Sequence, residues 1–459
     1  MSPLKRRIFS GANPDAIAED LKPLVDFGDD GLPLADLKRL IGERLVPHLA
    51  DYGLASFHSF FNSSPEPGAE LGASIALRWN QGVTNWQVSP GGAVLEELCC
   101  RALCRLFGFP ETADATFQYS GTYANQQALY LALHRKAEDC GFDLAEKGLR
   151  GFQKPESLAV AVSEQAHFSV RHAVRMLGLG EQSLIRVPVD VSQRMDVERL
   201  KGVLTDRRDG KDVFAVVATT GTTSTGAVDP AGPIIEACDG SRTWVHADGA
   251  YGLAYALVAE YAPLFEGFSG ADSVSWDPHK QLGVPIPNSV LFLKQRGDFR
   301  RMAIYDEYFN RRDDPFPNPG LKSAPSTRPM SALALIACLR HLGLAGMRWR
   351  LRAPLAAVKA FAEKLSRAPD IDLCHRPDTG ILCLRLVPEG FPPERLDILQ
   401  LYIYNRMQAG GEQGLGFALL ESRQPIWSGQ PGAFMRDANL NHVVTCAVKH
   451  RQHRASRHE

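Results

Sequence analysis

The chain has 459 residues, more than one hydrophobic core usually supports, so we expect two domains or one large domain with a satellite. Its apolar content of 44% and charged content of 22% are typical of globular proteins, and a net charge of −1 argues against nucleic acid or an anionic membrane as the main partner. No apolar run reaches the roughly 18 residues of a spanning helix, and no signal-like apolar core follows Arg7, so we predict a cytoplasmic protein. The cysteines lack C-x-x-C spacing, so we predict reduced thiols and no metal site.

Residues 1–69 show two short amphipathic patterns, at 16–27 and 34–52. Neither has enough apolar residues to build a core of its own, so this stretch needs another surface to cover it. We predict an amino-terminal arm that wraps around a second subunit. A long helix is expected after Pro90, where apolar residues recur at helical spacing.

A turn of small residues, Ser120-Gly121-Thr122, runs directly into a helical pattern at 124–136. Unpaired backbone N–H groups and the positive end of the helix dipole converge at such a turn, which makes it a candidate cradle for a phosphate group. The alternative is a plain N-cap, because Ser and Thr are common before helices for that reason alone.

Two buried strands are expected at 158–162 and 213–218, and each opens into polar residues at its carboxyl end. The first is followed by His167 and the second by Thr219-Thr-Gly-Thr-Thr-Ser-Thr-Gly226. These side chains could bind a ligand or could satisfy the backbone of ordinary turns. Strands that alternate with helical patterns, with a further strand at 289–294, predict an α/β fold in which a parallel sheet is covered by helices on both faces.

The most informative segments are Trp244-Val-His-Ala-Asp248 and Ser273-Val-Ser-Trp-Asp-Pro-His-Lys280. In each, a run of β-branched or aromatic residues ends in charged ones, which is typical of a buried parallel strand that delivers side chains at its carboxyl end. A lysine that follows a strand-ending proline and His279 is poorly placed for an ordinary surface charge. Together the segments indicate a pyridoxal phosphate site, with Lys280 as the Schiff-base amine and Asp248 on the pyridinium nitrogen.

The periodic pattern dissolves at 304–328 into prolines and charged residues, which predicts a functional loop or lid. A helix rich in Ala and Leu is expected from Ser331. We therefore divide the chain into an arm (1–69), a large cofactor-binding domain (70–346) and a small α+β domain (347–459) that ends in a basic tail.

These motifs resemble those of the group II pyridoxal-phosphate-dependent decarboxylases, which include glutamate, cysteine sulfinate and aromatic amino acid decarboxylases. The resemblance covers about residues 57–436, and its most specific parts are His246-Ala-Asp248-Gly-Ala-Tyr and Asp277-Pro-His-Lys280. It implies the type I fold of the aspartate aminotransferase superfamily, with a mostly parallel central sheet, helices on both faces and a small α+β carboxyl-terminal domain. It also implies a homodimer whose subunits share the active sites.

The resemblance further implies a role for individual residues. Lys280 would bind the cofactor and later handle protons, Asp248 would keep the pyridine nitrogen protonated, and His167 would stack on the ring. Gly121 and Thr122 would bind the phosphate. Further cofactor contacts are implied for Asn125, Thr223, Asp277 and His279.

Two departures from the family pattern bear on the reaction. Relatives usually present a loop tyrosine that protonates the carbanion, whereas this chain has Phe316 near that place, and Tyr305 and Tyr308 earlier in the loop are then the candidate donors. Relatives also carry Thr-Ser-Gly-Gly where this chain has Gln118-Tyr-Ser-Gly121, so the phosphate cradle is altered.

We therefore predict a decarboxylase that removes the α-carboxylate of a small or polar L-amino acid, giving the amine and carbon dioxide, with pyridoxal phosphate as its cofactor. Three alternatives stay open. The same cofactor could support aldehyde-forming oxidative deamination or carbon–carbon lyase chemistry, and a catalytically inactive scaffold could keep the fold. The loop from Gly221 to Gly226 could instead bind a nucleotide, although the sequence has no G-x-x-x-x-G-K-[ST] motif.

Overall fold

The computed structural model describes residues 9–53, 61, 63–206, 210–306, 310–312, 315–396, 398–400, 402, 418–422 and 441–447. Their contacts divide the chain into two compact units. The larger unit comprises Pro65–Lys359 and His375–Ile381. The smaller unit comprises Met1–Ser64, Ala360–Cys374 and Leu382–Glu459.

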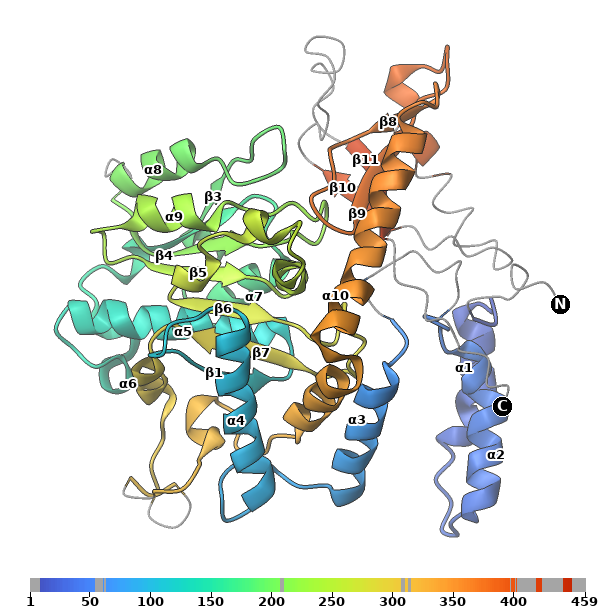
Figure 1. Cartoon of the computed structure of the whole chain (residues 1–459), viewed down its shortest axis with the longest axis horizontal. Helices are drawn as coiled ribbons and strands as arrows, with labels where there is room; N and C mark the ends of the chain where they lie inside the picture. The colour runs from blue at the N-terminus through green and yellow to red at the C-terminus, as the bar shows by residue number, and fades with distance from the viewer. Residues whose placement is uncertain are drawn as a thin grey trace. The chain divides into compact units, whose positions relative to one another are not determined.

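The larger unit is built on a seven-stranded sheet (Figure 1). Its strands are β1 (Asp114–Gln118), β2 (Leu158–Ser163), β3 (Leu184–Val187), β4 (Asp212–Thr219), β5 (Trp244–Asp248), β6 (Ser273–Trp276) and β7 (Ser289–Leu293). The spatial order is β1-β7-β6-β5-β4-β2-β3, and only β7 runs against its neighbours. The predicted α/β fold with a mostly parallel sheet is thus confirmed, and the strand expected at 289–294 is the one that reverses direction.

Helices cover both faces of this sheet. They include α5 (Gly121–Asp139), α7 (Phe168–Met176), α8 (Val197–Thr205) and α9 (Ala231–Cys238). The chain crosses the sheet in one direction from β1 through β2 to β3, and in the other from β3 through β4 to β5. Because such connections are right-handed, α5 and α7 lie on one face and α8 and α9 on the other.

The core on the α5 face follows from residue alternation. In strands, every second side chain points to the same face. Val160, Val217 and Leu291 from three strands pack there against Ala128 and Leu131 of α5. Small alanines on α5 bring the helix close to the sheet, which places its amino terminus beside the strand ends.

Further α-helices described in the larger unit are α3 (Pro67–Trp79), α4 (Pro90–Leu106), the short α6 (Leu144–Lys147) and most of α10 (Ser331–Leu365). The helices expected after Pro90 and from Ser331 are confirmed. The second of them has a kink at Gly343, where φ is 62°, and runs through the position of the predicted boundary near 346.

The described part of the smaller unit includes the helices α1 (Pro14–Leu21) and α2 (Leu34–Arg44), the end of α10 and a second sheet. Neither α1 nor α2 has a buried residue, which agrees with a stretch that cannot build a core of its own. The sheet has the order β10-β11-β9-β8, with strands β8 (Ile371–Leu373), β9 (Ile381–Leu386), β10 (Ala418–Ser422) and β11 (Asn441–Ala447). Across the described part of the chain, no helix has the length and apolar character needed to span a bilayer.

Candidate active site

A cavity of about 220 Å³ lies at the carboxyl edge of the central sheet. Since β7 reverses between β1 and β6, the carboxyl ends of the other strands meet at this edge, where ligands of open α/β sheets bind. Eight of the predicted site residues line the cavity: Gly121, Thr122, Asn125, His167, Thr223, Asp248, Asp277 and Lys280.

Asp248 is the buried carboxylate of this cavity, and it ends β5. Its oxygens accept hydrogen bonds from Asn125 Nδ2 at 2.7 Å and from the backbone N–H of Ala250 at 3.1 Å. Burial would raise the pKa of Asp248, but electrostatic interactions with His246, His167 and Lys280 and the hydrogen bond from the Ala250 N–H bring this pKa below its ordinary value. The side chain is therefore an ionised hydrogen-bond acceptor at neutral pH.

Lys280 is placed by the segment that follows β6. Its Nζ lies 3.1 Å from Oδ2 of Asp277, a carboxylate that is itself buried. Oδ1 of Asp277 accepts a 2.6 Å hydrogen bond from Oγ of Ser289 on β7. Asp277 is thus held by a neighbouring strand and in turn holds the amine at the cavity wall.

His279 does not line the cavity, unlike its neighbours in the same segment. Its Nε2 lies 3.6 Å from Oδ2 of Asp277, and its Nδ1 lies 2.6 Å from the backbone oxygen of Asn288. Burial lowers the pKa of His279. The residue therefore lies behind Asp277 as a neutral ring.

The amino terminus of α5 forms another wall of the cavity. Ser120 caps this helix, since its Oγ accepts a hydrogen bond from the backbone N–H of Tyr123 at 3.4 Å. A Cβ added to Gly121 would lie 2.9 Å from Oδ2 of Asp277 and 3.0 Å from the Cβ of Ala250. Only glycine lets the helix start this close to Asp277, so the turn is both an N-cap and part of the cavity.

His167 caps the amino terminus of α7. Its Nδ1 accepts a hydrogen bond from the backbone N–H of Ser169 at 3.2 Å. Burial lowers the pKa of His167, and this effect outweighs the opposite influence of Asp248. The cavity is therefore bordered by a neutral imidazole.

In the segment after β4, polar side chains make hydrogen bonds within the segment. Gly221 has φ +109°, and a Cβ there would lie 2.7 Å from the Cα of Gly252, so the loop needs glycine at this position. The hydroxyls of Thr222 and Thr225 lie 2.8 Å apart. Thr223, by contrast, lines the cavity.

Of the predicted proton donors, Tyr305 does not line the cavity. Tyr305 is 40% exposed, and the Arg312 guanidinium lies 4.4 Å from the centroid of its ring. Tyr308 lies outside the described residues. Phe316 stacks on Trp86 with ring centroids 5.2 Å apart. Among the described residues of the 304–328 loop, none lines the cavity.

Two residues of the site, Ser275 and Tyr251, were not predicted from the sequence. Ser275 pairs with Asp248 in the register of β5 and β6, and its Oγ lies 3.2 Å from Oδ1 of Asp248. Tyr251 lines the cavity and is buried, and its hydroxyl lies 3.3 Å from that of Tyr255. The available signal was spacing, because Tyr251 closes the same short motif that contains Asp248.

These residues fit pyridoxal phosphate. A lysine amine, an ionised carboxylate and a helix amino terminus line one cavity, and they match the aldehyde, the ring nitrogen and the phosphate of that cofactor. Thr219 also lines the cavity, and its buried Oγ1 has no hydrogen-bond partner among the described residues. A polar ligand would satisfy this hydroxyl.

Comparisons with known proteins agree with this fit. A family model described as the pyridoxal-dependent decarboxylase conserved domain matches residues 21–387. The chain is 31% identical over 415 residues to L-2,4-diaminobutyrate decarboxylase of Rhizobium meliloti (strain 1021), covering 89% of this chain and 79% of the relative. It is 28% identical over 448 residues to human cysteine sulfinic acid decarboxylase, covering 94% and 87% of the two chains.

Solved structures share the fold. The apo form of mouse CSAD matches with a TM-score of 0.82 at 24% identity, covering 97% of this chain and 90% of the other. The glutamate decarboxylase domain of a diaminobutyrate-pyruvate transaminase and L-2,4-diaminobutyrate decarboxylase from Vibrio parahaemolyticus matches with a TM-score of 0.82 at 22% identity, covering 97% and 87%.

Proposed function

The chain belongs to the pyridoxal-dependent decarboxylase family, and from this membership we propose that Lys280 carries the cofactor while the enzyme removes the α-carboxylate of a small, polar L-amino acid. The resemblance stated from the motifs is confirmed, together with the cofactor and the class of enzyme. The observation that carries the proposal is the cavity, which joins Lys280, Asp248, His167 and the start of α5.

When bound, pyridoxal phosphate supplies an electron sink for the bond that releases carbon dioxide. The ionised Asp248 would pair with a protonated ring nitrogen through a charge-assisted hydrogen bond, about twice as strong as a neutral one. The backbone N–H groups of Gly121 and Thr122 would hold the phosphate at the positive end of the α5 dipole. Neutral His167 would stack on the ring without adding a charge.

The remaining predicted residues take supporting roles in this proposal. Lys280 would hold and move a proton at Nζ, with Asp277 orienting the amine from 3.1 Å. Asn125 would act on the cofactor through Asp248, since its Nδ2 donates to that carboxylate. Thr223 would add a hydroxyl contact, and His279 would support Asp277 from behind.

A small polar substrate is supported by the relatives and by the cavity. The relatives are named for diaminobutyrate and cysteine sulfinic acid, both short amino acids with a polar side chain. The hydroxyl-bearing residues Ser120, Thr122, Thr219 and Thr223 line the cavity. A panel of about twenty amino acids, scored for release of carbon dioxide, tests the substrate class. Faster turnover of large aromatic amino acids than of every short polar one would contradict it.

Replacement of Lys280 tests the assignment of the cofactor lysine. Lys280→Ala should abolish turnover and the visible absorption band of the bound cofactor while the circular dichroism spectrum stays unchanged. The control is Lys294→Ala, because Nζ of Lys294 donates to the backbone oxygen of Gly270 at 3.0 Å and does not line the cavity. A Lys280→Ala protein that releases carbon dioxide at the wild-type rate would remove this assignment.

A second candidate is decarboxylation coupled to oxidative deamination, which gives an aldehyde. It is favoured by the stacking of Phe316, which has no proton to donate, on Trp86 outside the cavity lining. Measurement of amine, aldehyde and peroxide in air separates the two reactions. If Tyr305 or Tyr308 donates the proton, its replacement by Phe should divert product from amine to aldehyde. Amine alone from the wild type and from both variants would mean that neither tyrosine is the donor.

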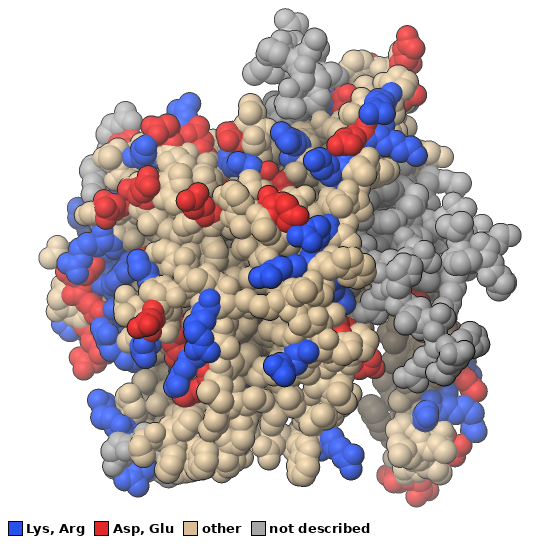
Figure 2. All heavy atoms as spheres, in the orientation of Figure 1, with Lys and Arg blue, Asp and Glu red and all other residues tan. Residues whose placement is uncertain are grey.

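We also propose a cytoplasmic homodimer in which residues 1–69 wrap around the second subunit. The support is exposed apolar surface: Leu71, Leu77 and Trp79 on α3 are 61%, 79% and 68% exposed. Figure 2 shows few charged side chains over the neighbouring α4. Light scattering at micromolar concentration should give about twice the chain mass of 50.4 kDa. A stable and active monomer would contradict the dimer.

A further inference from the structure

A chain of hydrogen bonds runs along β5 from Trp244 to Asp248. Nε1 of Trp244 donates to Oγ of Ser273 at 2.8 Å, and the same Oγ lies 2.8 Å from Nδ1 of His246. Nε2 of His246 lies 2.9 Å from Oδ1 of Asn125, whose Nδ2 donates to Oδ2 of Asp248 at 2.7 Å. None of these side chains is more than 4% exposed, so water competes little with these bonds.

Strand geometry brings these residues together. Trp244, His246 and Asp248 alternate along β5 and therefore point to the same face. β6 pairs in parallel with β5, so that Ser273 lies opposite His246. Asn125 comes from α5, the helix that covers this face.

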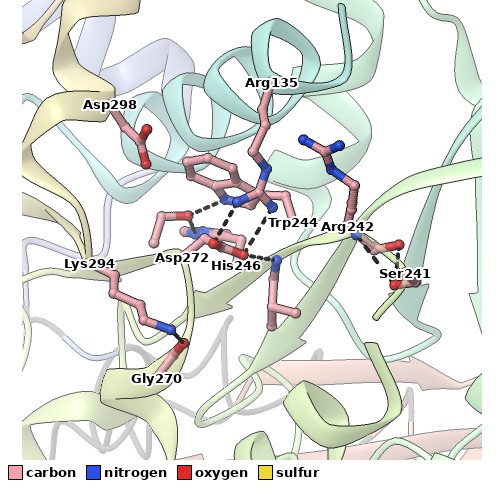
Figure 3. Close-up of polar contacts among 12 residues, drawn as sticks. Arg135, Ser241, Arg242, Trp244, His246, Gly270, Asp272, Lys294 and Asp298 are labelled. Carbon is pink, nitrogen blue, oxygen red and sulfur yellow. Dashed lines mark hydrogen bonds and ion pairs between the residues drawn. The ribbon is translucent and has the colours of Figure 1, made fainter. Parts of the chain in front are cut away.

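Arg135 holds the outer end of the chain, as Figure 3 shows. Its guanidinium lies 4.4 Å from the centroid of the Trp244 ring and donates to both carboxylate oxygens of Asp272, at 2.7 and 3.2 Å. Asp272 also accepts a 2.8 Å hydrogen bond from the backbone N–H of Val245. Arg135, itself held by Asp272, thus packs on one face of the Trp244 indole and limits its rotation.

The two ends of the chain allow one arrangement of protons. An indole N–H can only donate, and an ionised carboxylate can only accept. Because Asp248 accepts from Nδ2 of Asn125, Oδ1 of the same amide faces Nε2 of His246 and accepts its proton. Nδ1 of the neutral ring is then an acceptor, so Ser273 donates its hydroxyl proton to Nδ1 while it accepts from Trp244. Burial lowers the pKa of His246 to about 4, so the ring is neutral at pH 7, as this arrangement requires.

The same amide also reaches His167. Nδ2 of Asn125 donates to Oγ of Ser169 at 2.9 Å, and this Oγ lies 2.8 Å from Nδ1 of His167. Nδ1 of His167 also accepts from the backbone N–H of Ser169 at 3.2 Å, so this nitrogen carries no proton and the Ser169 hydroxyl donates to it. Neutral His167 therefore carries its proton on Nε2.

We propose that Trp244, Ser273 and His246 are positioning residues for the reaction. They act through Asn125, and they set the direction from which hydrogen bonds reach Asp248 and His167. The proposal rests on the function proposed for Asp248. With the opposite tautomer of His246, two acceptors, Nε2 of His246 and Oδ1 of Asn125, would face each other in a buried site. The amide would then be held only by Asp248 and Ser169 at Nδ2 and by Ser275, whose Oγ donates to Oδ1 at 3.0 Å.

The test removes one N–H and keeps the ring. Trp244→Phe retains an aromatic face under Arg135 but cannot donate to Ser273. Trp276→Phe is the matched control, because Trp276 is equally buried, lies on β6, and its indole nitrogen has no hydrogen-bond partner in the described part of the chain. Nitrogen-15 NMR of histidine side chains in the cofactor-free protein reports which ring nitrogen holds the proton, with His246→Gln used to assign the resonance.

In the wild type and in Trp276→Phe, His246 and His167 should both hold their proton on Nε2 at pH 7. In Trp244→Phe, His246 should become a mixture of tautomers, and the dissociation constant of the cofactor should rise about tenfold. Ser273→Ala should act in the same way, and it serves if Trp244→Phe does not fold. A wild-type proton on Nδ1 of His246, or equal effects of the two tryptophan substitutions, would overturn the proposal.

The NMR result is independent of catalysis, since it is read without cofactor. Full activity of Lys280→Ala would overturn the proposed function while the proton positions on His246 and His167 stayed as expected. Normal loss of activity in Lys280→Ala, combined with a wild-type proton on Nδ1 of His246, would overturn the positioning role alone.

Discussion

The buried ion pair of Arg328 and Glu96 offers a sharp test of how the 304–328 loop is anchored. Arg328 is 3% exposed and Glu96 is 2% exposed. Nη2 of Arg328 donates to Oε1 of Glu96 on α4, and also to Oγ1 of Thr116 at 3.2 Å and the backbone oxygen of Phe117 at 3.1 Å, both on β1. The end of the loop is thereby joined to a helix and to the central sheet.

Removal of one partner leaves the other charge buried without a counterion. Arg328→Met or Glu96→Leu should therefore lower the free energy of unfolding by about 3–5 kcal/mol. The pair itself is incompletely satisfied, because Nη1 of Arg328 and Oε2 of Glu96 have no hydrogen-bond partner among the described residues. The double variant should consequently lose far less stability than the sum of the single variants, since it leaves no buried charge.

Urea unfolding of the cofactor-free protein, followed by circular dichroism at one protein concentration, measures these differences through the midpoint at constant slope. Arg352→Met is the control, because Arg352 pairs at 2.8 Å with Glu260 in an exposed position and its loss should leave the midpoint unchanged. Single variants at Arg328 and Glu96 within about 1 kcal/mol of the wild type would refute the reasoning, since no buried charge would then have been left unpaired.

Three further predictions concern the cavity. Asp248→Asn should reduce turnover by several powers of ten and weaken cofactor binding; activity within about threefold of the wild type, roughly 0.65 kcal/mol of barrier, would exclude the proposed role. Gly121→Ala should raise the dissociation constant of the cofactor at least tenfold, because the new Cβ would clash with Asp277. The control is Gly91→Ala on α4, where a Cβ has nothing within 4 Å, and this variant should bind the cofactor as the wild type does. Equal affinities of the two variants would show that the close approach of Gly121 to Asp277 does not matter. Burial lowers the pKa of His246 from 6.5 to about 4, so between these values the unfolded chain binds more protons, and stability should fall by about 3 kcal/mol as the pH drops through this range. His246→Gln should flatten that pH dependence in urea unfolding; an unchanged slope would contradict it.

Short-range sequence patterns were sufficient to predict that Lys280 and Asp248 lie at the carboxyl ends of buried strands. Asp248 ends a five-residue strand and Lys280 follows a four-residue strand within a few residues, and the burial of both strands is visible in their composition. The strands β1 and β3 were not predicted, because Asp114–Gln118 mixes polar and apolar residues and Leu184–Val187 is only four residues long. Composition alone gives weak signals for such segments.

The sequence could not indicate which way the side chains of His279 and Tyr305 point, for a physical reason. His279 is adjacent to Lys280, but the chain turns after β6, so that Lys280 lines the cavity while His279 faces Asn288. Tyr305 is in the predicted loop, yet it packs with Arg312. Proximity along the chain does not determine the direction in which a side chain points.

The sequence by itself determined the class of fold, the family, and the lysine and carboxylate around which the cavity is built, because these depend on motifs a few residues long. Only the tertiary structure decided which groups control Asp248. Its partner Asn125 lies on another element, 123 residues away along the chain. The register that places Ser273 opposite His246 is set by the packing of whole strands. Hydrogen bonds between distant segments depend on that packing, which no local pattern specifies.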